Sequence, residues 1–185
     1  MVRPRCALRR AAPPASLRAV NNAGVFRKGT ISGTTVTDWD FVMNINVTGT
    51  FLGMKAAGAL MQRAGSGSII NISSIAGLGG TGNSAAYSTS KWAVRGLTKA
   101  GAKEMGPAGV RCNSVHPGLI STRMLHADDA TGVGIPPGAS PESVPLGRLA
   151  EASEVATVVL FLASDDAGYV NGAEFTVDGG MSSSL

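Results

Sequence analysis

The sequence predicts an α/β domain in which helices cover both faces of a doubly wound, parallel β-sheet. Short apolar runs typical of strands alternate with longer segments whose apolar residues recur at helical spacing. Such alternation favours parallel strands joined by helices that pack on the sheet. A length of 185 residues, 44% of them hydrophobic and 15% charged, fits one domain with its own core.

The predicted strands are four short segments, each next to a turn or a glycine-rich loop. They cover residues 17–20, 68–73, 110–115 and 175–177. The first runs into the turn NNAG (21–24), where asparagine and glycine tolerate left-handed backbone angles. The third leads into the turn His116-Pro117-Gly118.

Three long helices are predicted, over residues 37–63, 84–105 and 151–163. The first is expected to start at Thr37, with Asp40 at its third position in an approximate capping box. Its apolar stripe consists of Phe41, Ile45, Thr48, Phe51, Leu52 and Leu60.

Three glycines lie inside this first helix: Gly49, Gly53 and Gly58. Each costs about 1 kcal/mol relative to alanine in a helix interior. They therefore predict close packing against a neighbour, either another helix or a second subunit. Residues 123–147, by contrast, are polar, rich in glycine and proline and poorly periodic, which indicates a mobile segment over a site.

Charge and composition argue against nucleic-acid and membrane partners. The net charge of +4 comes from residues 1–18, which hold five arginines and no acidic residue, so the remainder has 11 basic and 12 acidic residues. No basic stripe interleaved with aromatics appears elsewhere. The longest aliphatic run without a charge, Val155–Ala163, is too short to span a bilayer. Cys6 and Cys112 suggest neither a disulfide framework nor a metal site, which favours a reducing, cytoplasmic setting.

Residues 1–16 form an Arg/Pro/Ala-rich tail without apolar periodicity, which we expect to be disordered and separate from the domain over 17–185. Two interpretations stay open. An Arg-rich, acid-free start is typical of a transit peptide. It is also what an unselected upstream reading frame would encode, and we favour that second interpretation.

The strongest chemical signal is Tyr87 followed four residues later by Lys91, with Ser74 thirteen residues before the tyrosine. Residues four apart share one face of a helix. A nearby ammonium favours a phenolate and is expected to lower the pKa of Tyr87 from its ordinary value near 10. A tyrosine tuned in this way can exchange a proton with a substrate oxygen. On its own, however, this spacing is more often a half-buried ring beside a solvated lysine.

Six motifs in order give the pair its context. They are NNAG (21–24), NINVTG (44–49), ISS (72–74), YSTSK (87–91), HPGLIST (116–122) and VDGG (177–180). In this set and order, from Asn21 to about Gly180, the chain resembles the short-chain dehydrogenase/reductases. Within that family it looks most like bacterial 3α/20β-hydroxysteroid dehydrogenases, while acyl-carrier-protein reductases share the scaffold. The resemblance implies a three-layer, Rossmann-like fold and a reaction that interconverts a secondary alcohol and a ketone.

The resemblance also implies roles for the matching residues. Tyr87 would be the general acid/base, Lys91 would lower its pKa and bond the nicotinamide ribose, and Ser74 would orient the substrate oxygen. Asn46 would hold a water that passes the proton out toward Lys91. Besides Tyr87 and Lys91, the cofactor contacts implied are Asn21, Ala23, Pro117, Gly118, Ile120 and Thr122. The cofactor would be NAD or NADP, with NAD slightly favoured.

Several of these residues have a simpler interpretation. Asn46 could bond a backbone group at a helix kink. Thr122 could cap a helix that begins at Arg123. His116 is interpreted as structural rather than catalytic, because the proton donor is already assigned. Met105, Met124 and Met181 could line an apolar pocket or fill gaps in a core.

The sequence departs from the family pattern at its start. The resemblance implies a glycine-rich phosphate turn, TGxxxGxG, within further βαβ units ahead of NNAG, and no such motif occurs in the chain. The fold is therefore expected to lack the first βαβ units and to expose strand 17–20 as an apolar edge. Two alternatives to an active enzyme remain, namely a truncated, non-catalytic fragment and a self-associating module. Family resemblance implies a homodimer or homotetramer, and a small-molecule alcohol or ketone as substrate.

Overall fold

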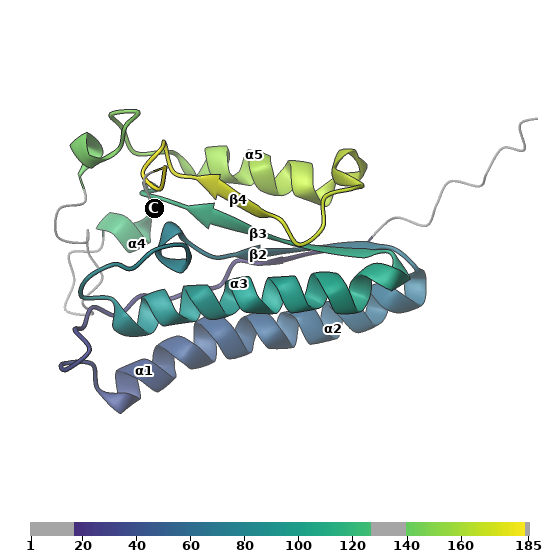
Figure 1. Cartoon of the computed structure of the whole chain (residues 1–185), viewed down its shortest axis with the longest axis horizontal. Helices are drawn as coiled ribbons and strands as arrows, with labels where there is room; N and C mark the ends of the chain where they lie inside the picture. The colour runs from purple at the N-terminus through teal and green to yellow at the C-terminus, as the bar shows by residue number, and fades with distance from the viewer. Residues whose placement is uncertain (1–16, 127–139, 184–185) are drawn as a thin grey trace, which may run out of the picture.

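A computed structural model describes residues 17–126 and 140–183. Its centre is a parallel sheet of β1 (Leu17–Asn21), β2 (Gly67–Ile72), β3 (Val110–Pro117) and β4 (Glu174–Val177), in that spatial order (Figure 1). The pairing runs Leu17 with Gly67 and Gly67 with Val110, so the carboxyl ends of the strands meet at one edge. The predicted parallel sheet is confirmed.

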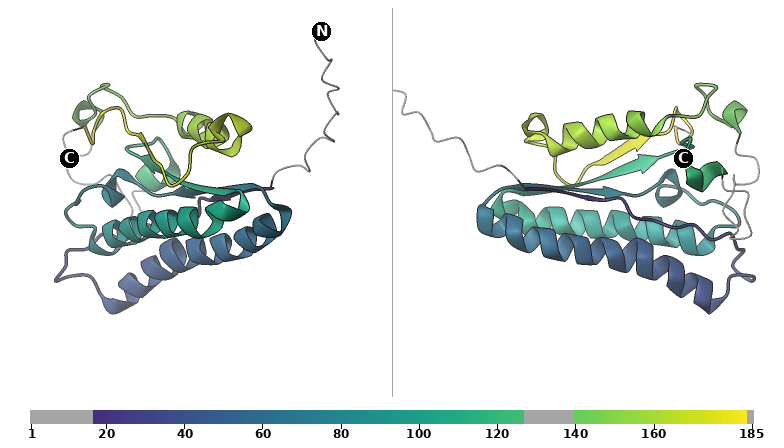
Figure 2. Two further views of the ribbon diagram at one scale, coloured as in Figure 1. Left: turned by 45° about the vertical axis from the view of Figure 1, so that its right-hand side comes forward. Right: turned by 180° about the vertical axis from the view of Figure 1, so that it is seen from behind.

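Helices cover both faces of this sheet. On one face lie α2 (Gly49–Ala64) and α3 (Ala85–Met105), with α1 (Val36–Met43) continuing into α2 through the π-helical turn η1 (Asn44–Thr48). On the other face lies α5 (Ala152–Ala163), as Figures 1 and 2 show from three sides. The predicted three-layer architecture is confirmed, and a short helix, α4 (Arg123–His126), follows β3.

The core is divided by the sheet into two clusters. Successive strand residues point to opposite faces, so Ile69 packs toward α2 and α3 whereas Ile70 packs toward α5. The first cluster consists of Met54, Met61, Ile69, Ala102, Met105, Val110 and Cys112. The second consists of Ile70, Val115, Leu162 and Ala167. Met105 is therefore a core residue rather than part of a pocket.

The first helix begins at Val36, so its predicted start at Thr37 was wrong by one residue and its predicted cap by two. The cap is Thr35, whose side chain accepts a hydrogen bond from the Asp38 amide at 3.0 Å and donates one to the Asp38 carboxylate at 2.7 Å. Thr35 and Thr37 are equally good caps by residue type, so the sequence alone does not choose between them.

The predicted apolar stripe of this helix lies on the wrong side to form the core. Phe41, Phe51, Leu52 and Leu60 are 37%, 47%, 54% and 52% exposed. The buried positions are instead Val42, Asn46, Thr50, Met54, Gly58 and Met61. Consequently a row of large apolar side chains faces outward along α1 and α2. This row, called the outer stripe below, consists of Phe41, Phe51, Leu52 and Leu60.

Two of the three helix glycines allow close packing inside the chain. A side chain at Gly58 would meet the Met105 sulfur of α3, and one at Gly53 would collide with the Asn21 side chain of β1. At Gly49 a β-carbon would meet only ordinary contacts. The neighbours of Gly53 and Gly58 are therefore elements of the same chain.

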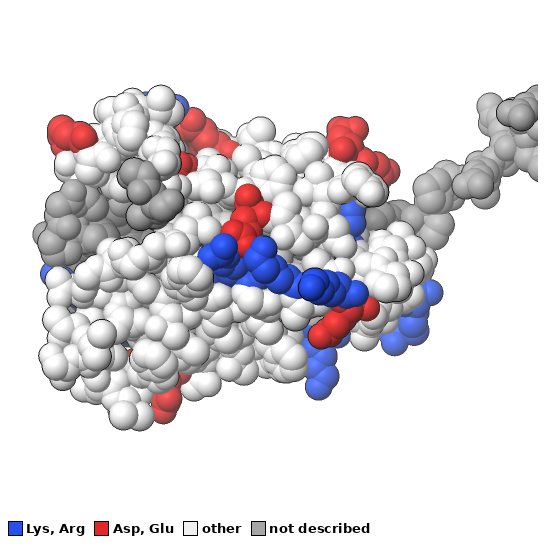
Figure 3. Space-filling model, in the orientation of Figure 1, with Lys and Arg blue, Asp and Glu red and all other residues white. Residues whose placement is uncertain are grey.

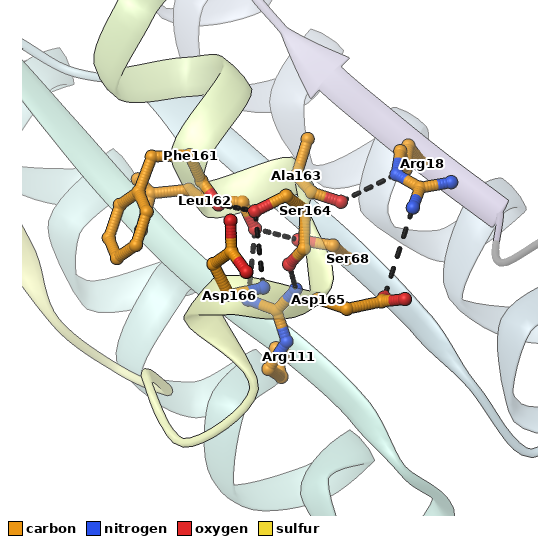
Figure 4. Close-up of polar contacts among 9 residues, drawn as sticks. All are labelled: Arg18, Ser68, Arg111, Phe161, Leu162, Ala163, Ser164, Asp165 and Asp166. Carbon is orange, nitrogen blue, oxygen red and sulfur yellow. Dashed lines mark hydrogen bonds and ion pairs between the residues drawn. The ribbon is translucent and has the colours of Figure 1, made fainter.

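Polar contacts fasten the carboxyl end of α5 to the sheet (Figure 4). Arg111 of β3 donates to the carbonyl oxygens of Leu162 and Ser164, both at 2.9 Å, and the Ser68 hydroxyl donates to Leu162 at 2.8 Å. The last carbonyls of a helix have no partner within it and carry its negative dipole end, so guanidinium donors are favourable there. Arg18 of β1 adds a bond to the Ala163 carbonyl.

Ion pairs join α3 to β4. Arg95 and Lys99 both contact the Glu174 carboxylate, at 2.7 and 2.6 Å. Figure 3 shows the basic side chains that gather in a row over α3 on this face, next to acidic ones. At least two basic side chains on α3, Arg95 and Lys99, are thus paired with an acidic residue of the same chain.

Two predictions lie wholly or partly outside the described residues: the tail over 1–16, and the central part of segment 123–147. Within the described residues, no helix combines the length and the apolar character needed to cross a membrane.

Candidate active site

A cavity of about 1020 Å³ opens at the carboxyl ends of the strands, between the sheet and α5. Ligands of open α/β sheets bind at this edge, because the loops that leave the strands diverge there. The cavity brings together most of the predicted site residues, namely Ala23, Ser74, Tyr87, Lys91, Pro117, Gly118, Ile120 and Thr122.

Ser74 follows β2 and begins the short helix η2 (Ile75–Gly77). Its hydroxyl accepts a hydrogen bond from the Ala76 amide at 3.1 Å. Gly77 lies so close to α3 that a side chain there would collide with the Lys91 carbonyl and the Ser73 hydroxyl. Because η2 is pressed against α3 in this way, Ser74 is held on the same cavity wall as the tyrosine.

Tyr87 and Lys91 stand on the first turns of α3, as their spacing predicts. The Lys91 ammonium lies 5.5 Å from the centre of the Tyr87 ring and donates to the Ile72 carbonyl oxygen at 3.0 Å. Lys91 is 5% exposed, so it is a buried charge and not the solvated lysine of the simpler interpretation.

Asn46 is buried in the π-helical turn η1. Its side chain exchanges two hydrogen bonds with the backbone of Val25, at 2.8 and 2.9 Å, and donates a third to the Ser90 hydroxyl at 2.9 Å. The structure thus shows the backbone contact that the simpler interpretation predicts, at the π-helical turn. The predicted water-holding role stays a prediction.

The NNAG turn lies beside this group, but Asn21 does not line the cavity. The Asn21 side chain points to the opposite face of the sheet, where it donates to Asn71 at 2.7 Å and abuts Gly53. Asn22, Ala23 and Gly24 line the cavity instead. The placement of the Asn21 side chain therefore does not support the predicted contact with a cofactor.

The loop after β3 forms the far wall. Gly118 donates to the Val177 carbonyl at 3.0 Å, and a β-carbon on Gly118 would collide with Asp178. The HPG and VDGG motifs therefore pack on each other. The Thr122 hydroxyl contacts the Ile120 carbonyl at 3.4 Å rather than an amide of the following helix.

The family comparison agrees with this geometry. The family profile described as enoyl-(acyl carrier protein) reductase matches residues 18–182. Trans-4-hydroxycyclohexanecarboxylate dehydrogenase of Sinomonas cyclohexanicum is 49% identical over 161 residues, and 3-alpha-(or 20-beta)-hydroxysteroid dehydrogenase of Mycobacterium tuberculosis is 47% identical over 169. The chain belongs to the short-chain dehydrogenase/reductase family.

This short-chain dehydrogenase/reductase spans only part of its relatives. The matched region covers 87% and 90% of the chain but 58% and 60% of the two relatives named. Among solved structures, a gluconate 5-dehydrogenase from Burkholderia cenocepacia in complex with NADP and tartrate is similar with a TM-score of 0.83. It is 32% identical in sequence, and the match covers 91% of this chain and 66% of that one.

Burial dominates the electrostatics of Tyr87 and Lys91. It lowers the pKa of Lys91 to about 8, since an ammonium in the cavity wall loses its hydration. It also raises the pKa of Tyr87, with a hydrogen bond from Ser74 acting in the opposite direction. The predicted lowering of the tyrosine pKa was therefore wrong, because desolvation of the phenolate outweighs the hydrogen bond from Ser74.

Sequence reasoning missed two residues that shape the site. Phe26 packs edge-to-face on Tyr87, with ring centres 5.0 Å apart, and lines the cavity. Gly24 lies where a β-carbon would be 3.4 Å from the Lys91 ammonium. Gly24 stood inside the NNAG motif and could have been chosen with it, whereas no pattern marks Phe26. Met124 and Met181 line the cavity, as one of their two interpretations predicts.

Proposed function

We propose that this family member interconverts a secondary alcohol and a ketone, with hydride passing to or from a nicotinamide dinucleotide. The observation that carries the proposal is the convergence of Ser74, Tyr87 and Lys91 on one cavity at the carboxyl edge of the sheet. The proposal covers the whole protein as well as this chain, which spans about three fifths of the relatives named.

The side chains divide the work on the substrate oxygen. During alcohol oxidation the O–H proton passes to Tyr87 while the C–H hydrogen leaves with its electron pair, and reduction reverses both transfers. The Ser74 hydroxyl donates a hydrogen bond to the same oxygen and fixes its position. The positive charge of Lys91 favours the phenolate form of Tyr87, which is the form that accepts the substrate proton.

The residues of the cavity fit a nicotinamide. When bound, the nicotinamide supplies or accepts the hydride. Lys91 uses one of its N–H donors on Ile72 and faces Gly24, whose missing side chain leaves room beside the ammonium for a ribose hydroxyl. Ala23, Pro117, Gly118, Ile120 and Thr122 would hold the remainder. By its likeness to hydroxysteroid dehydrogenases, NAD is slightly favoured over NADP.

The lining supports a ring-bearing, apolar substrate. Ile75 and Leu125 and the α5 residues Val155 and Val159 all face the cavity. Burial of such surface favours a hydrocarbon skeleton, about 25 cal/mol for each Å² removed from water. The relatives named above, which act on a hydroxycyclohexanecarboxylate and on hydroxysteroids, support the same substrate class.

The decisive experiment measures binding before turnover. The full chain is titrated with NADH and with NADPH by fluorescence, and oxidation of trans-4-hydroxycyclohexanecarboxylate is then followed by NAD(P)H absorbance. Tyr87→Phe is expected to bind cofactor as the wild type does and to lose turnover by about 100-fold or more. Absence of cofactor binding at millimolar concentration would instead identify the chain as a non-catalytic fragment.

A second proposal concerns assembly. The outer stripe exposes large apolar side chains along one side of α1 and α2, and monomeric proteins rarely expose such rows. We infer that the chain self-associates through this stripe, as a homodimer or homotetramer. A second copy is the simplest occupant, because a two-fold axis places the same stripe on both sides of the interface.

A further inference from the structure

His116, at the end of β3, is completely buried and uses both of its ring nitrogens. Nδ1 lies 3.0 Å from the Ser74 carbonyl oxygen, and Nε2 lies 2.8 Å from the Ser114 hydroxyl. A carbonyl oxygen only accepts, so the proton must be on Nδ1. In the neutral ring Nε2 is then an acceptor, and the Ser114 hydroxyl donates to it.

The contact lies where the strands separate. Backbone pairing between β2 and β3 ends with Ile72 opposite Val115, followed by a last bond from the Ser73 amide to the Val115 carbonyl at 2.8 Å. Ser74 is the next residue and has no backbone bond to β3 among the described contacts. The backbone hydrogen bonds between β2 and β3 therefore stop at Ser73, and the next contact between the two segments is the bond from the His116 imidazole to the Ser74 carbonyl.

Within η2, the Ser74 carbonyl also accepts the Gly77 amide at 2.9 Å. That bond fixes the turn itself but moves with it. The bond from His116 instead connects Ser74 directly to strand β3 of the sheet. It thereby sets the position of the serine relative to Tyr87, which stands on a different element.

We propose that His116 is a positioning residue. Its Nδ1–H donates a hydrogen bond to the Ser74 carbonyl and thereby holds Ser74 where its hydroxyl can reach the substrate oxygen. The role rests on the function proposed above for Ser74. It requires the neutral ring with its proton on Nδ1. The Ser74 carbonyl selects this tautomer, and the Ser114 hydroxyl is compatible with it because it can donate to Nε2.

The surroundings favour the neutral ring. Burial lowers the pKa of His116 and outweighs the bond to the Ser74 carbonyl, which raises it. The charged groups that face the ring are Glu174 on β4 and Arg95 and Lys91 on α3, and their effects partly cancel. The position of the proton can therefore be examined directly by NMR, without cofactor or substrate.

The first test uses ¹⁵N-labelled histidine in the full chain. We expect His116 to show a protonated Nδ1 and a bare Nε2 at neutral pH, and to gain its second proton only below the ordinary histidine pKa of about 6.5. The chain has two histidines, so the signals that disappear in the His116→Asn variant are assigned to His116. A proton on Nε2, or titration at the ordinary pKa, overturns the proposal.

The second test compares His116→Asn with His116→Gln. The asparagine amide reaches the place of Nδ1 and can still donate to Ser74, whereas the glutamine amide reaches the place of Nε2 and keeps only Ser114. Each variant loses one buried bond, so urea midpoints should shift alike. We expect kcat to fall by about 10- to 100-fold in His116→Gln and by much less in His116→Asn, with cofactor Kd unchanged in both.

Equal losses of kcat in the two variants, in step with their stability, would show a merely structural histidine and overturn the proposal. The ¹³C shift of the Ser74 carbonyl separates this failure from a failure of the proposed function. It should stay near the wild-type value in His116→Asn and move in His116→Gln. If the wild type has no turnover, the proposed function fails, and this carbonyl shift alone decides whether His116 positions Ser74.

Discussion

Asn46 joins three segments of the candidate active site through its side-chain amide. The Asn46 side chain forms two hydrogen bonds with the Val25 backbone and donates a third to the Ser90 hydroxyl. That hydroxyl in turn donates to the Tyr87 carbonyl at 2.7 Å. The loop that follows β1 is thereby joined to the tyrosine helix. A buried amide with several partners is costly to replace, because any partner left unpaired keeps its desolvation penalty.

Lys91→Met should stabilise the chain while abolishing the proposed chemistry. The folded state lowers the pKa of Lys91 to about 8 from 10.5, so the charged form is disfavoured by folding. We expect the free energy of unfolding at pH 7 to rise by about 1–3 kcal/mol in the variant, measured by urea denaturation. The loss of the bond to Ile72 limits the gain.

The same lysine predicts a pH dependence with a definite sign. Between pH 8 and 10.5 the unfolded chain binds more protons at this position than the folded chain, so Lys91 makes stability rise with pH in that window. The buried Cys112 thiol, whose pKa is raised from 9.0 to about 12, acts in the opposite direction above about pH 9, so the net rise of the wild type is expected between pH 8 and 9. Above about pH 10 the raised pKa of Tyr87 acts in the opposite direction, because the unfolded chain loses the phenol proton first. Lys91→Met should lack the rise, and an equal rise in both proteins would contradict this attribution.

At the scale of the elements, motif spacing and periodicity were sufficient to locate most of the fold. The four strands and the helices α3 and α5 lie within two residues of their predicted bounds, since each has a clear period and a marked end. The apolar stripe of the first helix was assigned to the wrong side because its largest apolar residues face outward both before and after the π-helical turn, whereas the buried face includes Asn46, Thr50 and Gly58, which a search for apolar periodicity does not select. The pKa directions of Lys91 and Tyr87 depend on burial by distant segments, and spacing alone does not carry that information.

Alanine substitutions in α2 separate helix propensity from packing. Gly49→Ala should raise the free energy of unfolding by up to about 1 kcal/mol, because alanine favours the helix and its β-carbon meets only ordinary contacts. Gly58→Ala should lower it by about 1–2 kcal/mol, because the β-carbon would lie 2.5 Å from the Met105 sulfur in the core. Urea denaturation of the two variants checks both signs, and a gain in both would show that Met105 moves aside freely.

The outer stripe can be tested with one charge on each face of the molecule. Leu52→Glu should dissociate the proposed assembly, because two copies would bury like charges against apolar surface. Leu160→Glu is the matched control: Leu160 is 71% exposed, but it lies on α5, on the opposite face of the sheet. Light scattering at several concentrations measures the mass, and a monomeric wild type, or dissociation by both variants, would refute assembly through the stripe.

For the molecule as a whole, β1 is the exposed limit of the sheet. Among the strands that the structure describes it pairs only with β2, and its side chains Leu17 and Val20, which point to opposite faces, are 43% and 47% exposed. The expectation of an apolar edge strand is thus confirmed for the described residues. An edge with apolar surface on both faces is a template for further strand pairing, and natural sheets commonly protect such edges with lysine.

Leu17→Lys should therefore slow aggregation of the isolated chain without loss of fold. The substitution places a charge on a strand that another chain would have to approach, while Leu17 contributes little to the core because it is half exposed. Ile31→Lys is the control, since Ile31 is 91% exposed and apolar but belongs to the loop between β1 and α1. Turbidity and light scattering over time measure the effect. Slower aggregation in Leu17→Lys alone would identify the strand edge as the site of pairing, whereas equal slowing in both variants would attribute the effect to net charge.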